Sequence, residues 1–149
     1  GADSKETEGQ LVLRRTIAAA HRERDYTLAA QLYVKLLKEL PTATLPSEIQ
    51  LDVVNELARS GQPAVAAQGY RLFLERFRTH PMIDDVRLML ATIELRRMGD
   101  AKAAAKTLEG LEGRPLDDDR AAIAASLRAD CAAGGASGGT TGEARGGAA

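Results

Sequence analysis

Apolar residues recur at intervals of three and four along the middle of the chain, which is the period of an amphipathic α-helix. Leu28, Leu32 and Leu36 form one such face. Ala, Leu, Arg and Glu, which favour helices, dominate this region, and sustained alternation of β-branched residues is absent. Prolines and glycines divide it into segments. The pattern predicts an all-α fold with seven helices, at about 10–24, 27–40, 48–60, 64–79, 83–98, 101–111 and 118–131.

Polar residues support these helix starts. Ser47 followed by Gln50 is a capping-box pattern, and Asp117 is expected to cap the last helix. The acidic runs 84–85 and 117–119 place negative charge in first turns, where it stabilises a helix. Consecutive helical residues point about 100° apart, so such a run cannot hold one metal ion.

The two ends of the chain differ from its middle. Residues 1–8 are polar, and residues 132–149 hold seven Gly and six Ala among eighteen, with no Leu, Ile, Val, Phe, Met or Tyr. Such segments cannot bury enough apolar surface to offset chain entropy. We expect disordered ends at 1–8 and 132–149, and one helical-repeat domain over 9–131.

The helices fall into a repeating pair. Asp25, Gln62 and Asp100 mark turns within successive pairs, 37 and 38 residues apart. An alanine follows each by four residues, and a larger apolar residue follows by eight and by eleven. The aligned residues are Ala29, Ala66 and Ala104, then Tyr33, Tyr70 and Leu108, then Leu36, Phe73 and Leu111, with prolines at Pro41, Pro81 and Pro115. The alanine permits two helices to cross closely, and the larger residues fill the space beside it. The pattern predicts three helical hairpins and a capping helix.

This spacing resembles the tetratricopeptide repeat, whose second helix carries the same alanine, aromatic and proline positions. The stretch 24–29 with Tyr33 and Pro41 is the closest match. The first helices depart from the family pattern, because none has a large aromatic residue early and none has a glycine where the helices of a pair usually touch. The resemblance covers about 9–131. It implies an α-α superhelix that binds other proteins.

Residues 64–98 are also similar to repeats in bacterial envelope assembly and coordinator proteins, and to the helical tails of some rhomboid-type membrane proteins. The preference for Arg over Lys and the many alanines suit a high-GC bacterial genome. The chain begins at Gly1 without a methionine, so we expect it to be processed or cut from a longer protein. The bacterial cytoplasm is the expected compartment, with the periplasm or a membrane tether as alternatives.

Charge and composition limit the classes of function that we expect of this chain. Lys and Arg total 20 and Asp and Glu total 21, which argues against nucleic-acid binding. No apolar run approaches the roughly 18 residues of a membrane span. Cys131 is single and is expected to be a small buried hydrophobe, while His21 and His80 lie at helix ends, where they favour the helix dipole. We expect no enzyme activity, cofactor or metal.

In stacked hairpins the first helices line a concave groove. The register places six arginines there, which would attract an acidic protein or peptide. The expected groove residues are Arg14, Arg15, Arg22, Leu51, Asn55, Arg59, Met89, Ile93, Arg96 and Arg97. The sequence therefore predicts a non-enzymatic interaction module. The alternatives are a self-associating architectural domain and a soluble appendage of a bacterial membrane protein of the rhomboid or envelope-assembly type.

Overall fold

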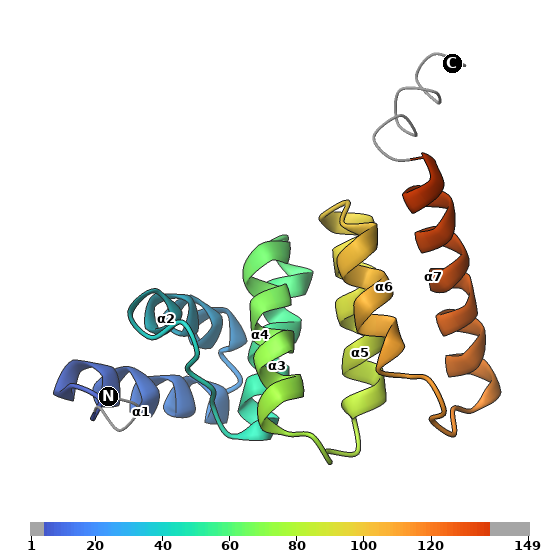
Figure 1. Cartoon of the computed structure of the whole chain (residues 1–149). Coiled ribbons are helices and arrows are strands. Elements are labelled where there is room, and N and C mark those ends of the chain that lie inside the picture. The colour runs from blue at the N-terminus through green and yellow to red at the C-terminus, as the bar shows by residue number, and fades with distance from the viewer. Residues whose placement is uncertain (1–4, 138–149) are drawn as a thin grey trace. The chain divides into compact units, whose positions relative to one another are not determined.

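The structure is a computed structural model that describes residues 5–137 of the chain, and these residues form helices and connecting turns without strands. The helices are α1 (Glu8–Arg22), α2 (Tyr26–Glu39), α3 (Ser47–Arg59), α4 (Pro63–Arg76), α5 (Ile83–Thr92), α6 (Ala101–Glu109) and α7 (Asp118–Ser137), with a π-helical turn, η1 (Ile93–Arg97), directly after α5 (Figure 1). The all-α fold class is confirmed. When η1 is counted as the continuation of α5, the first six helical segments begin and end within three residues of their predicted bounds.

The chain forms two compact units, Gly1–Arg78 and Thr79–Ala149. In unit 1, α1 packs on α2 and α3 packs on α4, so the unit consists of two helical hairpins, and α2 also packs on α3. In unit 2, α6 packs on α5 and η1, and α7 packs on α6 and α5. The predicted pairing of helices is thus present inside each unit.

The three predicted turns lie at equivalent places in the hairpins. Asp25, Gln62 and Asp100 are the N-cap residues of α2, α4 and α6. The side chains of Asp25 and Asp100 each accept a hydrogen bond from the backbone N–H three residues later, at 3.1 and 2.9 Å. All nine aligned alanine and larger apolar positions are buried. The sequence period therefore corresponds to equivalent core positions.

Parts of both terminal segments that the sequence predicts to be disordered are ordered within residues 5–137. Helix α7 continues to Ser137, so residues 132–137 are helical, and residues 138–149 lie outside the described part. At the other end, Thr7 and Gln10 form a capping box that begins α1. The residue before it, Glu6, is bound by Arg14. A polar segment can be held by such directed bonds without an apolar anchor, which composition alone does not reveal.

Gln50 has a different role from the capping role predicted for it. The N-cap of α3 is Pro46, with no side-chain cap bond, and Gln50 is fully buried. Its Oε1 atom accepts from the Leu45 N–H at 2.9 Å, and its Nε2 atom donates to the Tyr33 hydroxyl at 2.9 Å and to the Gly69 carbonyl at 3.1 Å. One amide therefore connects α2, α3, α4 and the α2–α3 loop.

The Tyr33 hydroxyl completes this buried polar cluster. It donates to the Ala43 carbonyl at 2.7 Å while accepting from Gln50. Burial raises the pKa of Tyr33 to about 12, so the hydroxyl remains protonated and able to donate at neutral pH. Buried polar groups stabilise a fold only when they form hydrogen bonds. The side chains of Tyr33 and Gln50 both do so.

Replacing Gln50 with leucine should destabilise unit 1 by about 3 kcal/mol, because the Leu45 N–H loses its partner while it remains buried. Urea unfolding followed by far-UV circular dichroism measures this loss, and hydrogen exchange over residues 43–70 assigns it to unit 1. The matched control is Gln31→Leu, the same change at an exposed position of α2, which should alter stability by less than about 0.5 kcal/mol. Equal effects of the two substitutions would contradict the role of the amide.

Helices α3 and α4 lie side by side and approach closely at Gly69 (Figure 1). A Cβ atom at this position would lie 2.5 Å from a Val54 methyl carbon. The predicted small residue of this hairpin, Ala66, is fully buried, but Gly69 is where no side chain fits. The close approach also brings the Gly69 carbonyl within reach of Gln50.

Gly69→Ala should therefore destabilise the protein by about 1–3 kcal/mol through overpacking, although alanine favours helices more than glycine does. Adding Val54→Ala should recover part of the loss, so a double-mutant cycle in urea unfolding should show favourable coupling. The control is Gly9→Ala in α1, where the added Cβ meets only Thr7 Oγ1 at 3.8 Å. Additive effects at Gly69 and Val54 would show that the two residues do not constrain each other.

Unit 2 has an aliphatic core, flanked by ion pairs. The buried residues of that core are Leu88, Ala91, Ala104, Leu108, Leu111, Ala124, Leu127 and Cys131. Asp84, at the start of α5, accepts from Arg114 at 2.9 and 3.3 Å. Its neighbour Asp85 accepts two hydrogen bonds from Arg120 of α7, which also pairs with Asp117. Asp84 and Asp85 lie in the first turn of α5, as predicted. The Asp85–Arg120 pair also joins α5 to α7, and the Asp84–Arg114 pair joins α5 to the loop before α7.

Candidate interaction site

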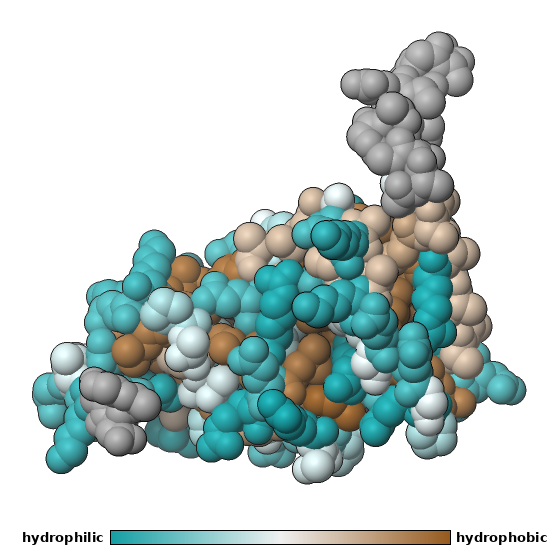
Figure 2. Space-filling view, viewed as in Figure 1, coloured by the Kyte–Doolittle hydropathy of each residue, from teal (hydrophilic) through white to brown (hydrophobic). Residues whose placement is uncertain are grey.

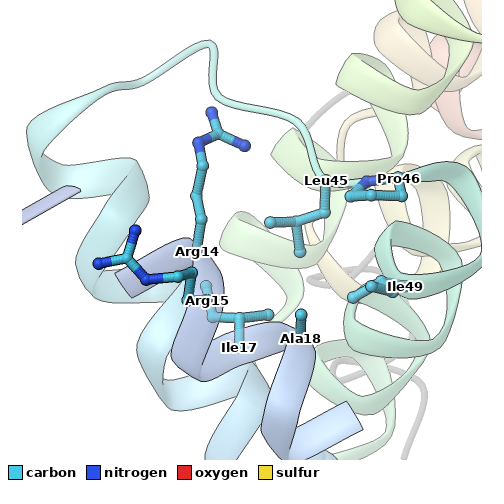
Figure 3. A pocket seen from close by; sticks show the side chains of 7 residues that line it. All are labelled: Arg14, Arg15, Ile17, Ala18, Leu45, Pro46 and Ile49. Carbon is cyan, nitrogen blue, oxygen red and sulfur yellow. The ribbon is translucent and has the colours of Figure 1, made fainter. Parts of the chain in front are cut away.

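A pocket of about 350 Å³ opens in unit 1 between α1, the α2–α3 loop and the start of α3 (Figure 3). We call it the α1–α3 pocket. Its lining residues are Arg14, Arg15, Ile17, Ala18, Leu45, Pro46 and Ile49. Five of these seven side chains are aliphatic, and the remaining two are guanidinium groups. The pocket thus combines an apolar floor with positive charge.

Each wall of the pocket is placed by a different part of the fold. Ile17 is fully buried, and with Ala18 it forms the α1 side. Leu45 is held on the loop side because its N–H donates to buried Gln50. Ile49 lies in the first turn of α3, directly before Gln50. The polar cluster inside unit 1 therefore also positions the loop that closes the pocket.

Arg14 is the more strongly bound of the two arginines. Its Nε and Nη2 atoms donate to the two carboxylate oxygens of Glu6 at 2.6 and 2.7 Å, and its Nη1 atom donates to the Thr44 carbonyl at 2.6 Å. Hydrogen bonding from Arg14 lowers the pKa of Glu6, so the carboxylate is charged at neutral pH. The guanidinium is oriented by three bonds.

Arg15 is held loosely. Its Nη2 atom lies 3.3 Å from Glu8 Oε2, and the two side chains are 66% and 81% exposed. An exposed pair of this kind contributes little stability and is screened by salt. Figure 3 shows both guanidinium groups at the edge of the pocket, directed away from Ile49. They can meet charged groups of a ligand whose apolar part fills the hollow.

The other predicted groove residues of unit 1 are half-buried Leu51 and exposed Arg22, Asn55 and Arg59. Asn55 Oδ1 accepts a hydrogen bond from the Tyr70 hydroxyl, which joins α3 to α4. Arg59 pairs with Glu56 one turn earlier in its own helix. Both side chains therefore already have partners inside unit 1.

Two of the four predicted groove residues in unit 2, Ile93 and Arg96, have surroundings different from those predicted. Ile93 is only 6% exposed, so it does not offer the apolar contact expected of it. Arg96 donates to Asp130 of α7 at 2.9 Å, which offsets part of its charge. Met89 is half-buried and Arg97 is exposed. Because η1 belongs to a helix that packs into the unit 2 core, periodicity alone could not separate its inner face from its outer face.

The two histidines make specific contacts. His21 lies in the last turn of α1, as predicted, and its Nε2 atom is 2.7 Å from Asp52 Oδ2 of α3. Its ring also lies 5.5 Å from the Tyr26 ring. His80 acts at the start of α5, because its Nδ1 atom accepts from the Met82 N–H at 3.0 Å. Both residues have structural partners.

Cys131 is buried in unit 2, as predicted, and burial raises the pKa of its thiol. Among residues 5–137, no group of three or more His, Cys, Asp or Glu residues is placed to hold a metal ion. The structure contains, over the same residues, no helix of the length and hydropathy that a membrane span needs.

Sequence reasoning located part of this site. It selected Arg14 and Arg15 from the first helix, but it did not select Leu45, Pro46 or Ile49. An apolar Leu–Pro pair directly before a predicted helix is the signal that could have pointed to the loop side. Spacing along one helix could not reveal this contact, because the loop lies about thirty residues after the part of α1 that it contacts. The hydrogen bond from Arg14 to the Thr44 carbonyl is an example.

Large apolar side chains are otherwise dispersed over the exterior. Those exposed by more than about a third are Leu11, Val12, Leu28, Met82, Met98 and Ile123. Hydrophilic side chains predominate on the face shown in Figure 2. Comparison with known proteins found no matching family model and no curated protein with significant similarity. The α1–α3 pocket is the feature of unit 1 that bears most directly on function.

Proposed function

We propose that the chain is a non-enzymatic, tetratricopeptide-like module that binds a segment of another protein in the α1–α3 pocket. The observation that supports this most directly is an apolar hollow of about 350 Å³ with two guanidinium groups at its edge. It lies beside α1 and α3, the first helices of two successive hairpins. These are the helices expected to face a partner in a hairpin-repeat protein.

The chemistry of the lining favours binding over catalysis. Aliphatic side chains gain about 25 cal/mol for each Å² of apolar surface removed from water, so one inserted aliphatic residue of a partner would contribute about 1.5–3 kcal/mol. Guanidinium groups remain protonated at neutral pH and do not act as general bases there. They do bind carboxylates with directional, bidentate hydrogen bonds. A partner segment with an apolar residue next to an acidic residue would bind both the aliphatic lining and the guanidinium groups.

The arginines outside the pocket are weaker candidates. Arg59 and Arg96 pair with Glu56 and Asp130, so charge reversal at either would also disturb a contact inside the protein. Substitutions within the pocket provide a cleaner test, because Ala18 carries no charge and Arg15 makes only an exposed pair with Glu8.

Ala18→Glu should reduce partner capture from source-organism lysate at least tenfold, because it places a carboxylate in the apolar hollow. The matched control is Ala64→Glu, the same substitution at an exposed position of α4, which should leave capture unchanged. Affinity capture with quantitative mass spectrometry measures both. Circular dichroism checks that the variants are folded.

Arg15→Glu provides a second variant that cannot act through the core, since its side chain is 66% exposed. It should weaken capture of the same protein. If Ala18→Glu and Arg15→Glu capture the same proteins as wild type and Ala64→Glu, the pocket is not the partner site.

Self-association is the second candidate, and the surface of α7 favours it. Ile123 of α7 is 48% exposed, and the helix also carries several exposed alanines. Figure 2 shows mildly apolar residues, in tan, along α7. Light scattering over a concentration series should show a dimer that Ile123→Glu dissociates, whereas a monomer at all concentrations would exclude this candidate.

A further inference from the structure

Arg14 binds Glu6 in the way that it would bind the carboxylate of a ligand. Two nitrogen atoms of the guanidinium donate to the two oxygen atoms of Glu6, which is the bidentate geometry preferred by Arg–carboxylate pairs. The third nitrogen atom donates to the Thr44 carbonyl, which fixes the orientation of the group. Arg14 is therefore a preorganised carboxylate receptor at the edge of the apolar pocket, and the protein's own N-terminal segment occupies it.

We propose that the α1–α3 pocket selects partner segments in which an aliphatic side chain lies next to Asp or Glu, and that Glu6 competes for the position of that carboxylate. The inference rests on the proposed function and adds the chemistry of the ligand and a built-in control of binding. The aliphatic side chain occupies the hollow beside Ile17, Ala18 and Ile49. The neighbouring carboxylate replaces Glu6 on Arg14.

The acids around the pocket provide the charge complementarity. Each arginine of the lining is paired with an acid that lies before or within the first turn of α1, Glu6 with Arg14 and Glu8 with Arg15. A short acidic segment of this chain thus already satisfies both guanidinium groups. A partner segment with acidic residues offers the same groups together with an apolar side chain that the pocket lining can bury.

Exchange of carboxylates does not require α1 to unfold. The side chains of Arg14 and Glu6 are 29% and 25% exposed, so solvent reaches the pair. The N-cap of α1 is Thr7, and its capping box with Gln10 does not involve Glu6. Glu6 can therefore leave Arg14 while the helix start remains intact. The tethered Glu6 has a high effective concentration, so it lowers the apparent affinity for any competing acid.

The test uses the full chain and a phage-displayed library of random dodecapeptides, followed by fluorescence anisotropy with synthetic peptides of the enriched sequences. Enriched peptides should carry Leu, Ile, Val or Met within two residues of Asp or Glu. Replacing that acid with its amide should weaken binding about tenfold. Ala18→Glu should abolish binding, whereas Ala64→Glu should not change it.

The Glu6→Gln variant separates competition from a structural role of Glu6. If Glu6 competes, Glu6→Gln should bind the acidic peptide several-fold more tightly than wild type and should not bind the amide peptide more tightly. The control is Glu23→Gln, which makes the same change of net charge at the exposed C-cap of α1. Weaker binding by Glu6→Gln, or equal gains from Glu6→Gln and Glu23→Gln, would overturn the competition.

The remaining outcomes distinguish this inference from the proposed function. Enriched peptides without an acid, or no enriched peptides at all, overturn the ligand chemistry. In that case the proposed function as an interaction module is still supported if Ala18→Glu abolishes capture of the cellular partner. Peptides that bind Ala18→Glu as well as wild type overturn the pocket itself. A wild-type dimer that Ala18→Glu dissociates, in the absence of enriched peptides, assigns the pocket to a second copy of this chain.

Discussion

The buried amide of Gln50 is the interaction on which the arrangement of unit 1 depends. It is fully enclosed, and it bonds to the Tyr33 hydroxyl, the Leu45 N–H and the Gly69 carbonyl. Apolar contacts tolerate small shifts of one helix against another, but these hydrogen bonds require particular distances and directions. The amide therefore specifies how α2, the α2–α3 loop, α3 and α4 are placed. The glycine at position 69 is part of the same constraint, because it lets α4 approach Val54 closely enough for its carbonyl to reach Gln50.

The same constraint creates the candidate binding surface. The loop that Gln50 anchors through Leu45 also supplies Pro46 to the pocket and the Thr44 carbonyl to Arg14. The pocket is consequently formed between an anchored loop and two helices, and its apolar floor is largely preformed. Preorganisation of this kind lowers the entropic cost of binding a flexible segment. It also couples stability to recognition, since loss of the core amide would move the loop side of the pocket.

Arginine serves two purposes in this chain. In unit 2, Arg114 and Arg120 bind the acids at the start of α5, and Arg96 binds Asp130 of α7. In unit 1, Arg14 combines a structural bond to the loop with a carboxylate that lies just outside α1. Several charges of the nearly neutral chain are thus neutralised in local pairs. At the α1–α3 pocket, two arginines lie together beside five aliphatic side chains.

The sequence by itself determined the helices, their pairing and the equivalent core positions, because these depend on residues three to eleven apart. Asp25, Ala29 and Tyr33 could be assigned from spacing alone, and the structure places them as a cap and two buried residues. The sequence also identified Arg14 and Arg15, since both follow from the register of one helix. Only the tertiary structure decided that Gln50 is a core residue, that Ile93 is buried and that a loop completes the pocket. Those facts depend on contacts between elements far apart in the chain, where a hydrophobic or polar pattern does not specify which groups meet.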